Sequence, residues 1–91
     1  MFHQFRENGI YHIAYTLEDV TDRPGAVVEY SFEGTQLVFN TIDTPTLPVC
    51  EDPVATYQVE LLANGNLRYR LVKDTCRQRA ASTVGDHVPV R

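Results

Sequence analysis

The sequence predicts an all-β domain: an antiparallel up-and-down meander of about seven strands that forms a closed or half-open barrel. Apolar and polar residues alternate with a period of two through most of the chain, which is typical of strands with one buried and one wet face. Turn-forming residues interrupt this pattern at short, regular intervals, which favours hairpin connections over helical crossovers. The 91 residues form a single domain, because they are too few for two independent cores.

Turn residues set the expected strand boundaries. Tight turns are predicted at Glu7-Asn8-Gly9, Asp22-Arg23-Pro24-Gly25, Glu33-Gly34 and Asn64-Gly65-Asn66, and a longer loop is predicted over residues 44–53, which contain three prolines. The expected strands between them cover residues 2–6, 10–18, 25–32, 35–42, 54–62, 67–73 and 86–90. One short helical turn is expected near residues 75–83, capped by Asp74.

All five tyrosines fall on the apolar side of these strands. In residues 10–18, for example, Tyr11, Ile13, Tyr15 and Leu17 share one face. An apolar cavity with a few phenol groups is a typical small-molecule site, so the inward positions are the predicted ligand contacts. These are Tyr11, Tyr15, Val28, Tyr30, Phe39, Tyr57, Val59, Tyr69 and Leu71. The alternative is that the tyrosines fill the core and point their hydroxyl groups out of the barrel mouth.

Charge and hydropathy exclude two classes of partner. The net charge of −4 argues against nucleic acid, because neutralising phosphates requires a basic surface. No apolar run reaches the roughly 18 residues that a membrane-spanning helix needs. The chain as printed is expected to be cytoplasmic, or exported if a signal segment has been removed.

The charge is distributed unevenly along the chain. Residues 1–45 carry two Arg and seven acids, while residues 46–91 carry six Lys or Arg and five acids. This asymmetry favours self-association.

Cys50 and Cys76 both fall in predicted loops. A bridge between them would close a loop of roughly 26 residues and stabilise the fold by about 3–4 kcal/mol. In the cytoplasm both thiols would stay reduced. The sequence leaves both states open.

No catalytic, cofactor or metal site is predicted. His3, His12 and His87 lack the close ligand pairs of zinc sites. Asp74 and Arg79 near Cys76 are interpreted as a structural corner in which Asp74 caps a turn and Arg79 pairs with it or spans the barrel end. The alternative, a reactive cysteine, would need a nearby base or a helix N-terminus.

From Arg23 onward the chain resembles the lipocalin-like family of small bacterial barrels. The resemblance lies in the hairpin over residues 30–39, in residues 55–59 and 65–69, and in a corner similar to that family's Asp-x-Cys-x-x-Arg pattern, here Asp74, Cys76 and Arg79. It implies a barrel with a ligand cavity. The chain departs from the family in lacking Trp, and in its last segment, His87-Val88-Pro89-Val90, where an aromatic residue is expected. The barrel is therefore expected to be truncated, shallow or completed by a second subunit.

The first functional expectation is a non-enzymatic binding module for a small apolar or aromatic molecule in a Tyr-lined cavity. A homodimer through an open sheet edge is expected, because seven strands leave an open edge unless the first and last strands pair parallel. Two alternatives remain: a cyclase- or isomerase-type enzyme that uses the cavity, or a structural or interaction domain with a filled core. The acids face outward by alternation, which disfavours the enzyme.

Overall fold

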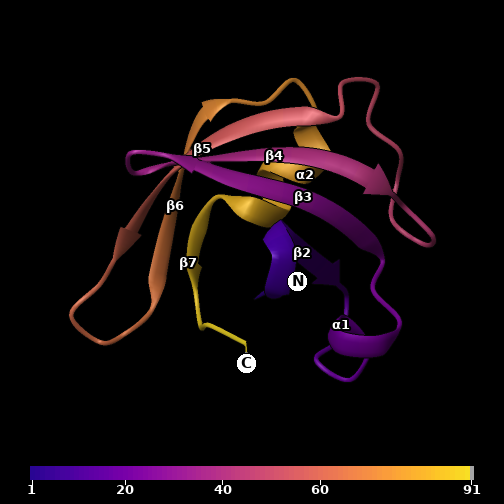
Figure 1. The fold of residues 1–91 in the computed structure, drawn as a ribbon, viewed down its shortest axis with the longest axis horizontal. Coiled ribbons are helices and arrows are strands. Elements are labelled where there is room, and N and C mark those ends of the chain that lie inside the picture. The colour runs from indigo at the N-terminus through magenta and orange to yellow at the C-terminus, as the bar shows by residue number, and fades with distance from the viewer. Residues whose placement is uncertain (91) are drawn as a thin grey trace.

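The structure, a computed structural model, describes residues 1–90 as one seven-stranded antiparallel sheet that curls into a nearly closed barrel (Figure 1). Each strand pairs with the next along the chain. The strands are β1 (Phe2–Phe5), β2 (Ile10–Ala14), β3 (Ala26–Glu33), β4 (Gln36–Asp43), β5 (Val54–Leu61), β6 (Leu67–Lys73) and β7 (Gly85–His87). The predicted all-β meander is confirmed.

Three short helical segments complete the fold: the 3-10 turn η1 (Glu7–Gly9), α1 (Asp19–Asp22) and α2 (Arg77–Thr83). The first follows from the predicted turn, because Asn8 and Gly9 adopt φ angles of 58° and 72°, which Asn and Gly tolerate best. The third confirms the predicted helical turn near residues 75–83. Within residues 1–90, none of these helices has the length and apolarity needed to cross a bilayer.

The prediction of one strand over residues 10–18 is wrong beyond Ala14. The chain leaves the sheet there and forms α1, whose start is marked by Thr16: its hydroxyl accepts a hydrogen bond from the backbone N–H of Asp19 at 3.3 Å. Such a local side-chain-to-backbone bond favours a turn over a continued strand, while the N-cap residue of α1, Glu18, makes no side-chain cap. Tyr15 and Leu17 therefore do not reach the core and are 57% and 55% exposed.

The predicted last strand, residues 86–90, is also too long. β7 ends at His87 and pairs only with residues 67–69 of β6. Pro89 has no N–H to donate to a ladder, and Val88 is exposed, so nothing extends the pairing further. The remaining strand boundaries agree with the prediction to within one residue.

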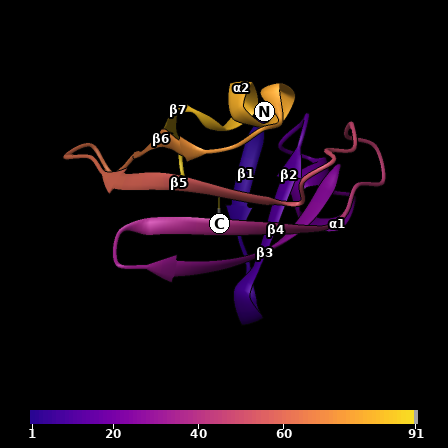
Figure 2. The ribbon, with the colours of Figure 1, turned by 90° about the horizontal axis from the view of Figure 1, so that it is seen from above.

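The strands β3, β4 and β5 and the helix α2 lie on opposite sides of the barrel (Figure 2). In Figure 2, β3, β4 and β5 form one wall, and α2 lies with the N-terminus on the opposite side of the molecule. β1 and β7, the two end strands of the sheet, are in contact through side chains: the ring centroids of His3 and His87 lie 4.5 Å apart. Within residues 1–90, no backbone pairing joins β1 to β7.

Aromatic side chains fill the interior. The buried cluster comprises Tyr11, Ile13, Ala26, Val28, Leu37, Phe39, Ala55, Tyr57 and Tyr69. The ring centroid of Phe39 lies 4.8 Å from that of Tyr11 and 5.7 Å from that of Tyr57, which are ordinary contact distances for packed aromatic rings. The barrel is therefore a packed core along most of its length.

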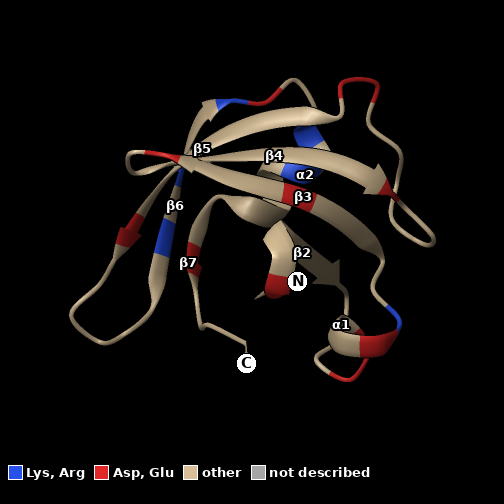
Figure 3. Cartoon of the chain, in the orientation of Figure 1, with Lys and Arg blue, Asp and Glu red and all other residues tan. Residues whose placement is uncertain are grey.

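Charged residues are distributed unevenly over the fold, with more acids in the N-terminal half and more Lys and Arg in the C-terminal half. Figure 3 places Lys and Arg on β6 and α2, and acidic residues on α1. The ion pair between Arg68 and Asp86, 2.7 Å apart, is solvent-exposed, so solvent screens it strongly.

Candidate functional site

The predicted ligand-contact residues divide into three groups in the structure. Tyr11, Val28, Phe39, Tyr57 and Tyr69 are fully buried in the core cluster, in contact with one another rather than with an open space. Tyr30 and Val59 are partly buried and pack against that cluster. Tyr15 and Leu71 are exposed.

Leu71 shows why period-two alternation is not sufficient to assign burial. It pairs with buried Tyr57 and so lies on the inward face, yet it is 51% exposed. β5 lies on one side of Leu71, but β7 pairs with β6 only as far as Tyr69, so the other side of Leu71 has no neighbouring strand among the described residues. The inward face of β6 is thus covered at one end and open at the other.

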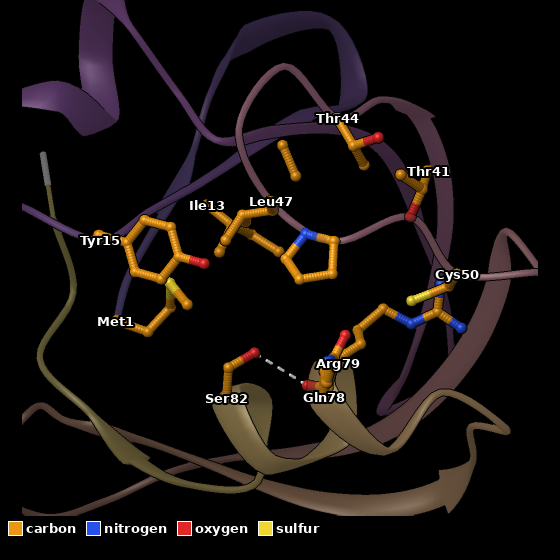
Figure 4. Close-up of a pocket in the computed structure, with 12 residues that line it drawn as sticks. Met1, Ile13, Tyr15, Thr41, Thr44, Leu47, Cys50, Gln78, Arg79 and Ser82 are labelled. Atoms are coloured by element: carbon orange, nitrogen blue, oxygen red, sulfur yellow. Dashed lines mark hydrogen bonds between the residues drawn. The ribbon is translucent and has the colours of Figure 1, made fainter.

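A cavity of about 230 Å³ lies at one end of the barrel, between the loop over residues 44–53, the helix α2 and the ends of β2, β3 and β4 (Figure 4). Its apolar wall comes mainly from Ile13, Tyr15 and Leu47. The complete lining is Met1, Ile13, Tyr15, Ala26, Thr41, Thr44, Leu47, Pro48, Cys50, Gln78, Arg79 and Ser82. Of the predicted ligand contacts, only Tyr15 is among them.

Two attachments hold the loop over the cavity. The backbone carbonyl of Gly25 accepts hydrogen bonds from the N–H groups of Thr46 and Leu47, at 3.4 and 3.2 Å. A Cβ at Gly25 would lie 2.7 Å from Cγ of Leu47, so this glycine permits the close approach of the loop. On the other side, a disulfide joins Cys50 to Cys76, the residue that precedes α2.

Beneath the disulfide lies a buried ion pair, the corner that the sequence predicts. Arg79 donates hydrogen bonds from Nε and Nη2 to the two carboxylate oxygens of Asp74, at 2.9 and 2.7 Å. Asp74 also accepts from the hydroxyl of Tyr57 and, at 2.9 Å, from the backbone N–H of Cys76. Both charged side chains are shielded from solvent, with 6% of Arg79 and 0% of Asp74 exposed. Asp74 therefore positions Arg79 and the start of α2 together.

The pKa values of this cluster follow from burial and hydrogen bonding. Burial alone would raise the pKa of Asp74, but the hydrogen bonds from Arg79, Tyr57 and the Cys76 backbone together hold it below its ordinary value. Burial, with the neighbouring Asp74 carboxylate, raises the pKa of Tyr57 well above its ordinary value. At neutral pH the cluster is therefore a carboxylate, a guanidinium and a neutral phenol.

One nitrogen of Arg79 is left without a partner. Nη1 is buried and, unlike Nε and Nη2, has no hydrogen-bond acceptor among the described residues. Figure 4 shows the guanidinium extending from α2 along one side of the cavity towards Cys50. Because a buried donor without an acceptor costs about 1–3 kcal/mol, this atom is a point at which a bound molecule would gain energy.

A second buried polar group lies at the junction of β1 and β7. Nε2 of His3 donates to the backbone carbonyl of Ser82 at 2.9 Å, which leaves Nδ1 as a buried acceptor without a partner. Burial, with a smaller contribution from His87, lowers the pKa of His3 to about 3. Residues 1–90 contain no group of three His, Cys, Asp or Glu side chains that could hold a metal ion.

Sequence reasoning missed most of the cavity lining because the cavity is built by a loop rather than by strands. Leu47 is the one signal that was present: an apolar residue within a polar, proline-rich segment, half-buried over the barrel end. Gln78 and Ser82 lie four residues apart and share a face of α2, but that face is recognisable only once the helix is placed.

The lining is suited to binding rather than to covalent chemistry. Cys50 is in a disulfide, and the hydroxyl of Ser82 donates to the backbone carbonyl of Arg79 at 3.0 Å, so neither is arranged as a nucleophile beside a base. No protein-family model, curated protein or solved structure matches the chain. The function is therefore inferred from the geometry of the cavity.

Proposed function

We propose that this protein is a lipocalin-like binding module that takes a small apolar or aromatic molecule in the cavity at the barrel end. The observation that carries the proposal is a cavity of about 230 Å³ with an apolar wall, beneath a loop that the Cys50–Cys76 disulfide anchors. Mostly apolar lining with a few polar groups is the usual composition of small-molecule sites.

The volume limits the size of the ligand. An apolar protein cavity of roughly 150 Å³ accepts benzene. A cavity of about 230 Å³ therefore has room for a single ring with a short substituent. Each CH₂ group buried against Ile13, Ala26 or Leu47 would contribute about 0.8 kcal/mol.

The test is an NMR titration of the protein with ethylbenzene. We expect the methyl signals of Ile13, Ala26 and Leu47 to shift together and to saturate. The variant Ser82→Leu, which fills the cavity, should weaken this binding at least tenfold. Ala81→Leu is the matched control, because Ala81 is an exposed neighbour on α2 outside the lining. Binding that resists Ser82→Leu would place the ligand elsewhere.

The packed interior favours a second candidate, a structural or interaction domain. Tyr11, Tyr57 and Phe39 are completely buried by one another and by their neighbours, so the barrel centre needs no ligand to be filled. Under this candidate ethylbenzene would leave the three cavity methyl signals unchanged at saturating concentration.

Two further properties are proposed with the binding function. The outer edges of β1 and β7 have no backbone partner among the described strands, which supports a homodimer through a sheet edge. Sedimentation that gives a monomer at every concentration would contradict it.

The disulfide supports the exported alternative for localisation, because cytosolic thiols are usually kept reduced.

A further inference from the structure

One residue of the cavity lining, Arg79, carries a strong donor that is buried just behind the cavity surface. Among residues 1–90, Arg79 is the one charged side chain that lines it. Nε and Nη2 of Arg79 are committed to Asp74 and, through Nη2, to the backbone carbonyl of Val54 at 3.3 Å. Nη1 has no acceptor. A guanidinium that is fixed on one side and unpaired on the other is preorganised to donate to a bound molecule.

We propose that the ligand of this cavity is an aromatic or aliphatic molecule with a neutral carbonyl oxygen, which accepts a hydrogen bond from Nη1 of Arg79. The inference rests on the proposed function and specifies the chemical class of its ligand. The apolar part of the ligand would lie against Ile13, Tyr15 and Leu47.

The charge balance favours a neutral acceptor over a carboxylate. Asp74 already compensates the charge of Arg79, with both side chains removed from solvent. A carboxylate ligand on Nη1 would add a second negative charge close to Asp74 and would have to lose its own hydration. A carbonyl group supplies the missing acceptor without either cost.

The position of Nη1 also sets a requirement on the loop. This atom has almost no exposed surface, so the ligand oxygen must displace the covering residues around Cys50 slightly. Cys50 is tied to Cys76, whereas the opposite part of the loop is held only by the two hydrogen bonds to Gly25. Adjustment is therefore expected at Leu47 and Pro48, with the disulfide left in place.

Three probes of similar size test the proposal on the unaltered protein: acetophenone, ethylbenzene and benzoate. Without a donor in the cavity, acetophenone should bind more weakly than ethylbenzene, because its carbonyl would lose its water. With Nη1 as donor we expect acetophenone to bind about tenfold more tightly than ethylbenzene, the usual gain from a hydrogen bond to a charged group. Benzoate should bind more weakly than acetophenone.

Each pattern of affinities has a separate meaning. If ethylbenzene binds as tightly as acetophenone, the carbonyl inference is overturned while the proposed binding function stands. If benzoate binds most tightly, the preference for a neutral acceptor is overturned. If none of the three binds, the proposed function fails and the inference fails with it.

Two variants identify the donor. Gln78→Met removes the neighbouring amide of the lining and should keep the preference for acetophenone. Arg79→Lys retains a cation for Asp74 but has no Nη1, and should lose that preference. The side-chain NH signals of Arg79 in the unaltered protein give a second measurement that does not depend on the folding of Arg79→Lys: acetophenone should shift them, and ethylbenzene should not. Loss of the preference in Gln78→Met alone would overturn the assignment to Arg79.

Discussion

The hydroxyl groups of Tyr11 and Tyr69 lie 2.8 Å apart inside the barrel, joined by one buried hydrogen bond between β2 and β6. These strands are separated by three others in the sheet, so the contact crosses the barrel interior. Burial raises the pKa of Tyr69 to about 12, and burial together with Tyr69 raises that of Tyr11, so both phenols are neutral at physiological pH. One phenol donates to the other, so both hydroxyl groups are engaged inside the core rather than facing a ligand cavity.

Tyr11→Phe should therefore destabilise the fold by about 1–3 kcal/mol, because it leaves the hydroxyl of Tyr69 buried without a partner. The double variant Tyr11→Phe with Tyr69→Phe should cost less than the sum of the two single changes, since it removes both polar groups together. Urea unfolding of the four proteins measures this coupling. Strict additivity would mean that the two hydroxyls do not interact in solution.

The fold could be predicted from the sequence because each strand carries its own period-two pattern between turn residues. Asn8 and Gly9 mark the first turn, and the three prolines over residues 44–53 mark the long loop. The predicted strand over residues 10–18 is wrong at Tyr15 for a local reason that period-two alternation does not reveal. The alternation continues past Ala14, but Thr16 accepts a hydrogen bond from the backbone N–H of Asp19 and so stabilises a turn. The residues beyond Ala14 therefore do not pair with the sheet.

The site could be predicted only in part. Asp74, Cys76 and Arg79 were recognisable as a structural corner, and the pairing of Asp74 with Arg79 is confirmed. The cavity beside this corner was not recognisable, because it depends on Gly25 allowing Leu47 to approach and on the Cys50–Cys76 bridge. Both are long-range relationships, whereas sequence patterns report neighbours along the chain.

Arg79→Ala should lower the stability by about 3–5 kcal/mol, because it leaves Asp74 as an uncompensated buried charge. Arg77→Ala is the matched control on the same helix and should change stability by less than about 0.5 kcal/mol, since Arg77 is exposed. Thermal or urea unfolding distinguishes the two variants. Equal stability of both would contradict the structural role of the Asp74–Arg79 pair.

Replacing both cysteines by serine should cost about 3–4 kcal/mol, as expected for opening a loop that spans a sequence separation of 26 residues. The amide signals of residues 44–53 should also lose protection from hydrogen exchange more than those of β3 or β4, because the loop then keeps its backbone hydrogen bonds to Gly25 and, at Pro53, to Thr41, but no covalent anchor. Unchanged protection in the loop would show that the disulfide does not anchor it.

Stability should fall as the pH falls below about 6.5, because His3 can accept a proton in the unfolded chain but not in the folded one. The folded-state pKa of His3 is about 3, lowered by burial and then by His87, against an ordinary value of 6.5. Between these values the unfolded state binds more protons, so His3 removes up to about 1.4 kcal/mol for each pH unit. Above about pH 6.5 its contribution is constant.

Urea unfolding between pH 4.5 and 7.5 measures this slope. His3→Phe should flatten it by about one proton, while His12→Gln, which replaces a histidine outside the β1–β7 junction, should retain it. A slope that is identical in His3→Phe and the unaltered protein would mean that His3 is accessible to protons in the folded state.

The most direct measurement is a crystal structure determined under xenon pressure, because xenon occupies apolar protein cavities without requiring a particular ligand chemistry. We predict a xenon site at the barrel end, in contact with Ile13, Ala26 and Leu47. A xenon site among Tyr11, Phe39 and Tyr57 instead, with none beneath Leu47, would contradict it.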